Sequence, residues 1–264
     1  GVFLRTQVAT AHVPIEIDGV SFFAVPYLEP EAVRAELNDA RGHVGVLTEA
    51  LSRIPATKLS VVLAHAWVAG GAACDSERDL TVGGVSAVPP SLFDRFTYTA
   101  LGHLHGPQVL RESLRYSGSP LAYSFSEAAH TKGTWLVEVT DEGLGVVEFR
   151  EAPVPRRLSS VRGTLEELLR DPALEGQEDH FLSGVLTDKA RPDEAMARLS
   201  SRFGHVLVLS HEPEGVVRDD ATYAARVTGR SDLEIAGAFV EHVRGTPASE
   251  GETALLTEAL ESVA

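Results

Sequence analysis

Three histidines that follow strand-like segments are the first candidates for chemistry. His65 comes directly after the apolar run 59–64, and His103 and His105 follow the run 96–101. Neutral imidazole is a good ligand for manganese, iron or zinc. Because residues i and i+2 of extended backbone point to the same side, we expect the rings of His103 and His105 to converge. The spacing predicts a partial metal site, against the alternative that these are ordinary histidines at strand ends.

The first block of the chain must position these histidines, and it is rich in predicted strands. A helical pattern at 30–51 is broken by Gly42 and Gly45, and a hairpin is indicated at 133–150. Tyr116 is interpreted as a core residue rather than a platform for base stacking. The predicted strands are Val20–Leu28, Leu59–Ala64 and Phe96–Leu101.

Two further blocks follow a proline-containing linker at 153–155. The second block alternates strands and helices over 158–209, with a capping box at Thr164 and Glu167 and a helix expected at 192–203, which is typical of a small α/β domain. The third holds two amphipathic helices that begin with capping boxes at Ser231 and Ser249. We expect these helices to dock on the main body or to bind a partner.

Composition limits the function further. The 264 residues are 44% hydrophobic and 23% charged, which excludes wholesale disorder, and the net charge of −15 excludes a uniformly basic nucleic-acid binder. The single cysteine, Cys74, excludes an intrachain disulfide and a zinc site built from cysteines, and it indicates a reducing compartment. The apolar stretch 59–74 is too short for a membrane span, and no signal peptide is visible.

Four segments read together resemble the nuclease subunits of bacterial SbcCD complexes, a branch of the calcineurin-like metallophosphoesterases. The last two are the most specific to this branch, and the similarity continues through most of the chain. The segments are AHAWVAGG at 64–71, ALGHLHGPQ at 100–108, RYSGSP at 115–120 and YSFSE at 123–127.

The resemblance implies a metal-dependent exonuclease and endonuclease that acts on double-strand ends and hairpins in DNA repair, recombination and replication. Two ions, usually Mn²⁺ with Mg²⁺ as the alternative, would share one site, with His65 and His103 on one ion and His105 on the other. The implied partners are DNA and the SbcC ATPase, with a homodimer inside a heterotetramer, no membrane, and a cytoplasmic, nucleoid-associated location.

The resemblance also implies an α/β (α+β) architecture in three parts. Residues 1–152 would be the C-terminal portion of a four-layer αββα sandwich, 153–230 a capping domain, and 231–264 a helical segment that binds the ATPase. We expect the DNA-binding residues to be Arg115, Arg156 and Arg157 and the partner-binding residues to be Phe239, Leu255, Leu256 and Leu260.

The sequence departs from the family in its first part. It contains no Asp-x-His, Gly-Asp or Gly-Asn-His-Asp motif, and its only asparagine is Asn38. About half the ligand set is therefore lacking, and the chain resembles a family member without its N-terminal part, where the catalytic residues would lie. Since two cations without bridging carboxylates repel each other, we expect this chain alone to have little nuclease activity.

Two other functions stay open at this stage. The chain could belong to a phosphodiesterase or phosphatase that acts on small molecules, although the capping block and the acidic tail have no evident use there. It could also be a non-catalytic scaffold that binds the ATPase.

Overall fold

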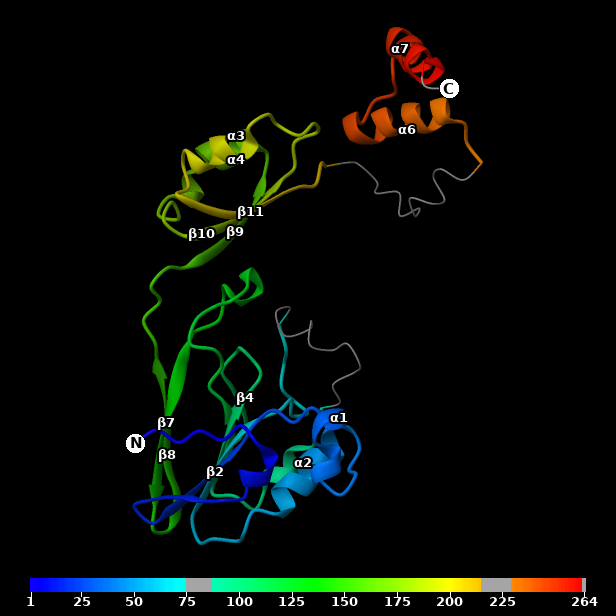
Figure 1. Cartoon of the computed structure of the whole chain (residues 1–264). Helices are drawn as coiled ribbons and strands as arrows, with labels where there is room; N and C mark the ends of the chain where they lie inside the picture. Colours follow the sequence, from blue (N-terminus) through cyan, green and yellow to red (C-terminus); the bar gives the residue numbers. More distant parts are fainter. Residues whose placement is uncertain (75–86, 215–228, 263–264) are drawn as a thin grey trace. The chain divides into compact units, whose positions relative to one another are not determined.

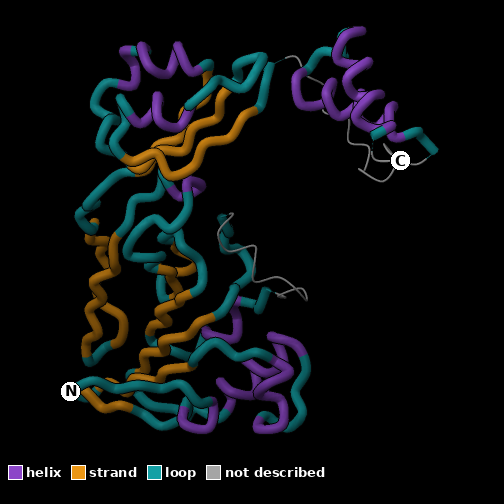
Figure 2. The backbone as a smooth tube through the Cα atoms, turned by 45° about the horizontal axis from the view of Figure 1, so that its top comes forward, coloured by secondary structure: helices purple, strands orange, loops and turns teal. Residues whose placement is uncertain are grey.

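The computed structural model describes residues 1–74, 87–214 and 229–262 (Figures 1 and 2). The chain divides into two compact units, Gly1–Arg157 and Leu158–Ala264. Both units combine helices with strands, so the α/β class expected from the sequence is confirmed. The sequence places its first domain boundary at 152/153, whereas the two units part after Arg157, and the segment 231–264 is grouped with the second unit.

The first unit is built on a six-stranded mixed sheet in the order β1-β2-β3-β4-β6-β5. Strands β2, β3, β4 and β6 run parallel, while β1 and β5 pair antiparallel at the two edges. A separate pair of antiparallel strands, β7 and β8, forms the predicted hairpin. The strands are β1 (Ile15–Ile17), β2 (Val20–Val25), β3 (Ser60–His65), β4 (Tyr98–Gly102), β5 (Gln108–Arg111), β6 (Leu114–Tyr116), β7 (Gly133–Thr140) and β8 (Gly143–Glu151).

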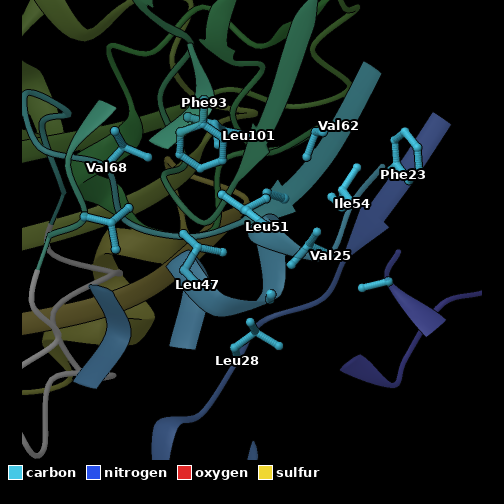
Figure 3. Packing of buried hydrophobic residues seen from close by; sticks show 14 of the residues in the cluster. Phe23, Val25, Leu28, Leu47, Leu51, Ile54, Val62, Val68, Phe93 and Leu101 are labelled. Carbon is cyan, nitrogen blue, oxygen red and sulfur yellow. The ribbon is translucent and has the colours of Figure 1, made fainter. Parts of the chain in front are cut away.

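Helices cover one face of this sheet and the β7–β8 hairpin covers the other (Figure 1). The main core lies under the helical face, where β2 and β3 contribute Phe23 and Val62 and the helix α2 (Gly42–Ser52) contributes Leu47 and Leu51 (Figure 3). A smaller core joins Val61 and Tyr98 of the sheet to apolar side chains of β7 and β8. The layers of the first unit are therefore helix, sheet and hairpin.

The helical pattern at 30–51 forms shorter pieces than its periodicity suggests. Helix α1 (Pro30–Val33) and a 3-10 turn (Arg34–Glu36) precede α2. The helical segment is interrupted at Asn38 and Asp39, whose backbone is left-handed, with φ of 54° and 55°. Gly42 begins α2 with φ of 65°, and Gly45 lies inside that helix. The prediction that Gly45 breaks the helix was therefore wrong.

The second unit contains a parallel three-stranded sheet in the order β11-β10-β9, with β9 (Leu158–Gly163), β10 (Phe181–Leu186) and β11 (His205–His211). Helices α3 (Leu165–Arg170) and α4 (Ala195–Ser200) pack on one face around the fully buried Leu182 and Leu199. The predicted capping box of Thr164 and Glu167 is confirmed at the start of α3. Helix α4 is shorter than the predicted span 192–203, and the left-handed backbone of Glu194, with φ of 50°, places its start at Ala195.

The tail consists of α6 (Asp232–Arg244) and α7 (Glu250–Glu261), which contact each other. Both predicted capping boxes, at Ser231 and Ser249, are present. Arg244 at the end of α6 forms an ion pair with Glu252 of α7, and the hydrogen bond from Arg244 lowers the pKa of Glu252 to about 2. Neither helix has a buried residue, and Phe239, Val243 and Leu255 are exposed. Within the described ranges, no helix has the length and apolar character needed to cross a membrane.

Tyr116 ties the end of β6 to the segment that follows β3. Its side chain is fully buried, which confirms its interpretation as a core residue. The phenol donates a hydrogen bond of 2.6 Å to the carbonyl of Ala66 and accepts one of 2.9 Å from the amide of Val68. This residue therefore fixes the backbone immediately after His65.

We expect Tyr116→Phe to destabilise the first unit by about 1–3 kcal/mol, because the Ala66 carbonyl and the Val68 amide would lose their partner in a buried place. Urea denaturation followed by tryptophan fluorescence measures this change. Tyr123→Phe is the matched control, since Tyr123 is 64% exposed. Equal stabilities of the two variants would contradict this role of Tyr116.

Candidate metal centre

The register of two parallel strands brings His65 and His103 together. His65 is the last residue of β3, and it pairs with Gly102, the last residue of β4. A β-carbon on Gly102 would lie 3.1 Å from Nδ1 of His65, so the glycine leaves room for that ring. Because parallel strands end at the same edge of the sheet, the next residue, His103, lies beside His65.

The two rings approach each other nearly at right angles. Nδ1 of His103 lies 3.4 Å from Nε2 of His65, and the planes are inclined by 86°. This separation is longer than a typical hydrogen bond, at about 2.7–3.2 Å. Two imidazole nitrogens that bind one ion at about 2.1 Å lie about 3.0–3.4 Å apart. The spacing therefore suits two ligands of the same transition-metal ion.

His105 belongs to a different group of side chains. Strand β4 ends at Gly102, and His103 has φ of 117°, so the segment 103–105 is not extended. Extended backbone, on which we based the expectation that the rings of His103 and His105 converge, is therefore not present in this segment. Ligand atoms of His105, Cys74 and Glu127 lie within 4.8 Å of one another. Among the described residues, this is the group of three or more histidine, cysteine or acidic side chains that has the spacing of a metal site.

Hydrogen bonds hold His105 from two sides. Its Nδ1 lies 2.9 Å from Oε1 of Glu127, which is fully buried. Its backbone carbonyl accepts hydrogen bonds from Nζ of Lys132 at 2.8 Å and from the amide of Ser119 at 3.1 Å. Lys132 also donates to Oε2 of Glu127 at 2.7 Å. The 103–107 loop is thereby fixed to the segment 117–132.

The sequence predicts no role for Cys74. Glu127 is noted there only as the last residue of the segment YSFSE, which resembles the family. The side chain of Gln108 donates to the carbonyl of Ala72 and accepts from its amide, both at 2.7 Å, which places the backbone two residues before Cys74. Cys74 and His130 also line an open cavity of about 410 Å³. The segment from Gly70 to Cys74 is short and apolar and contains no metal-binding motif. Nothing in the sequence therefore indicated that Cys74 is a candidate ligand.

Tyr27 and His43 extend the His65–His103 pair. The rings of Tyr27 and His65 are nearly perpendicular, with centroids 5.9 Å apart, and the Tyr27 hydroxyl lies 3.2 Å from Nε2 of His43. Burial, and then the nearby Glu29 carboxylate, raise the pKa of Tyr27, so its phenol stays protonated. Burial of the ring lowers the pKa of His65, which keeps its imidazole neutral, the form that binds metals, to lower pH.

The predicted DNA-binding arginines lie in different settings. The Arg115 guanidinium stacks over the ring of Trp135, 4.6 Å from its centroid, and its Nε donates to the carbonyl of Glu112. Arg156 is half-buried and Arg157 is exposed, at the end of the first unit. Arg115 thus packs against the β7–β8 hairpin through Trp135.

The donors present fit some ions better than others. Imidazole and thiol suit Zn²⁺ and similar transition metals, whereas Mg²⁺ prefers several oxygen ligands. Glu127, the one carboxylate of the His105 group, is already paired with Lys132. The residues described here therefore fit a transition-metal ion and fit Mg²⁺ poorly. A scan of the sequence against models of known protein families finds no match.

We expect Gly118→Ala to destabilise the protein by roughly 2–4 kcal/mol, since it combines left-handed strain with a steric clash. Gly118 has φ of 82°, and an added β-carbon would lie 2.6 Å from the carbonyl oxygen of His105. Gly19→Ala is the matched control, because Gly19 has the same φ of 82° with nothing within 4 Å. Urea denaturation compares the two. If both variants lose the same stability, Gly118 is not needed for the approach of the His105 loop.

Proposed function

We propose that this chain belongs to the nuclease subunit of an SbcCD-type complex, a metal-dependent phosphodiesterase that cuts DNA ends and hairpins together with an SbcC-type ATPase, and that the residues of this chain alone form an incomplete active site. The observation that carries the proposal is the convergence of His65 and His103 at one sheet edge, with 3.4 Å between their ring nitrogens. The four sequence segments that resemble this family include both histidines and Glu127.

The chain's own residues have distinct roles in this proposal. His65 and His103 bind one ion, and His105 contributes to the other. A bound ion would polarise the phosphate and lower the pKa of a water molecule. Tyr27, which is 40% exposed beside His65, has a protonated phenol that donates to Oε2 of Glu29 at 3.3 Å, and a phosphate oxygen would replace Glu29 as the acceptor of this hydrogen bond. Arg115, Arg156 and Arg157 are the proposed contacts to the DNA backbone.

Manganese is the proposed physiological ion because the family resemblance implies it, whereas the imidazole ligands themselves favour zinc as a tighter competitor. Two neutral imidazoles bind Zn²⁺ more strongly than Mn²⁺ in the usual order of divalent metals. Of the three ions, Mg²⁺ should have the lowest affinity, because the His65–His103 pair offers no oxygen ligand.

We expect His65→Ala and His103→Ala each to reduce Mn²⁺ affinity at least about tenfold, because losing a ligand should cost no less than losing an outer hydrogen-bond partner. Calorimetric titration with Mn²⁺ and with Zn²⁺ measures this loss. His12→Ala is the control, since His12 is exposed and outside the site. Manganese-dependent degradation of duplex ends should fall in parallel when the same substitutions are made in the intact gene product purified with SbcC.

Unchanged Mn²⁺ affinity in both variants would refute the shared-ion arrangement. Turnover of a small phosphodiester without DNA cleavage would favour a small-molecule phosphodiesterase. Binding of SbcC with no turnover of either substrate would favour a non-catalytic scaffold.

The tail is the proposed ATPase-binding surface. Phe239 of α6 and Leu255 of α7 are 55% and 66% exposed, while Leu256 and Leu260 are half-buried. Exposed aromatic and aliphatic side chains on a helix pair are typical of partner-binding surfaces. We therefore assign the direct contacts to Phe239 and Leu255, with Leu256 and Leu260 beside them.

We expect Leu255→Asp and Phe239→Asp to weaken binding to the coiled-coil base of SbcC by more than about tenfold, since a charge would be buried in an apolar interface. Surface plasmon resonance measures the affinity, and circular dichroism checks that the helices persist. Ala254→Asp is a control on the same helix at another exposed position. Loss of helicity in Leu255→Asp would instead assign the leucine to the protein's own core.

A further inference from the structure

Glu127 and Lys132 form an ion pair inside the first unit. Their side chains are 0% and 4% exposed, and Oε2 of Glu127 lies 2.7 Å from Nζ of Lys132. Charged side chains are rarely buried unless they are paired, and such a pair seldom adds net stability over an apolar one of the same shape. Stability alone therefore does not explain why the Glu127–Lys132 pair is buried here.

Every proton of the lysine ammonium group has an acceptor. Besides Glu127, Nζ donates to the hydroxyl oxygen of Ser119 at 2.9 Å and to the carbonyl of His105 at 2.8 Å. The Ser119 hydroxyl in turn donates to the carbonyl of Leu121 at 2.6 Å. Lys132 is thus hydrogen-bonded to the backbone of His105, while Oε1 of Glu127 contacts the ring of the same histidine.

The contact between Glu127 and His105 has a direct chemical consequence. An ionised carboxylate only accepts hydrogen bonds, so at 2.9 Å the Nδ1 atom of His105 must carry the proton. A neutral ring protonated at Nδ1 offers its lone pair at Nε2. Carboxylates that hold the second ring nitrogen of a metal-binding histidine act in this way in many metalloproteins.

We propose that Glu127 and Lys132 are positioning residues that fix His105 as its Nδ1–H tautomer and direct Nε2 to the metal. Glu127 thus acts behind the histidine and is not itself a metal ligand, although its carboxylate lies within ligand distance of the group. The metal-binding part of this inference rests on the proposed function, but the tautomer does not.

Two double variants separate positioning from structural support. A single substitution leaves one buried charge without its partner and can unfold the protein. Both Glu127→Gln/Lys132→Met and Glu127→Leu/Lys132→Met remove the two charges together. Only the first keeps a side-chain oxygen that accepts a hydrogen bond from Nδ1 of His105.

The tautomer is measured in metal-free protein by the nitrogen-15 chemical shifts of labelled histidine rings, with His105 assigned from His105→Gln. We expect the wild-type protein and the glutamine variant to show protonated Nδ1, and the leucine variant to gain the Nε2–H form. Zn²⁺ affinity should fall about 10–100-fold in the leucine variant and less in the glutamine variant. Thermal melting should show both variants folded.

A wild-type His105 protonated at Nε2, or a leucine variant with unchanged tautomer, would overturn the proposal. If the leucine variant is unfolded, the wild-type and glutamine spectra still decide it. Absence of DNA cleavage by the intact gene product with SbcC, alongside the expected tautomers, would count against the nuclease function and leave the positioning role standing. Retained Zn²⁺ affinity with a changed tautomer would refute the metal-directing part.

Discussion

The parallel register of β3 and β4 is the constraint on which the candidate centre depends. Pairing of His65 with Gly102 ends both strands at one sheet edge, so the next residue after β4 meets the last residue of β3. A shift by one residue would turn His65 to the opposite face of the sheet. Register is held by the cores on both faces, since Val62 packs under the helices and Val61 under the β7–β8 hairpin.

A second constraint acts beyond the strands, where regular backbone pairing no longer positions side chains. The segment 103–107 is fixed by polar contacts to residues 117–132, and the buried lysine and glutamate lie at their centre. Gly118 permits this close approach because it has no side chain facing the carbonyl of His105. Backbone order at His65 comes from sheet pairing and from Tyr116, whereas the backbone of His105 is held by hydrogen bonds from Lys132 and Ser119. The two candidate metal-binding groups are thus stabilised by different interactions.

Sequence patterns predicted the elements better than the details of the centre. Apolar periodicity located β2, β3 and β4, and all three Ser/Thr-x-x-Glu capping boxes occur where expected, because these signals are local. The metal group around His105 could not be predicted in this way. Cys74 and Glu127 are separated by 53 positions, and only the folded chain brings them together. Likewise, nothing in the sequence indicated the positive φ of His103, which removed the basis for expecting His103 and His105 to point the same way.

The most direct test of the account is a crystal structure of the protein grown with Mn²⁺, with diffraction data measured on both sides of the manganese absorption edge. We expect an anomalous peak in contact with Nε2 of His65 and Nδ1 of His103, which lie 3.4 Å apart. Manganese bound only elsewhere, with these two imidazoles not coordinated to any ion at saturating Mn²⁺, would contradict it.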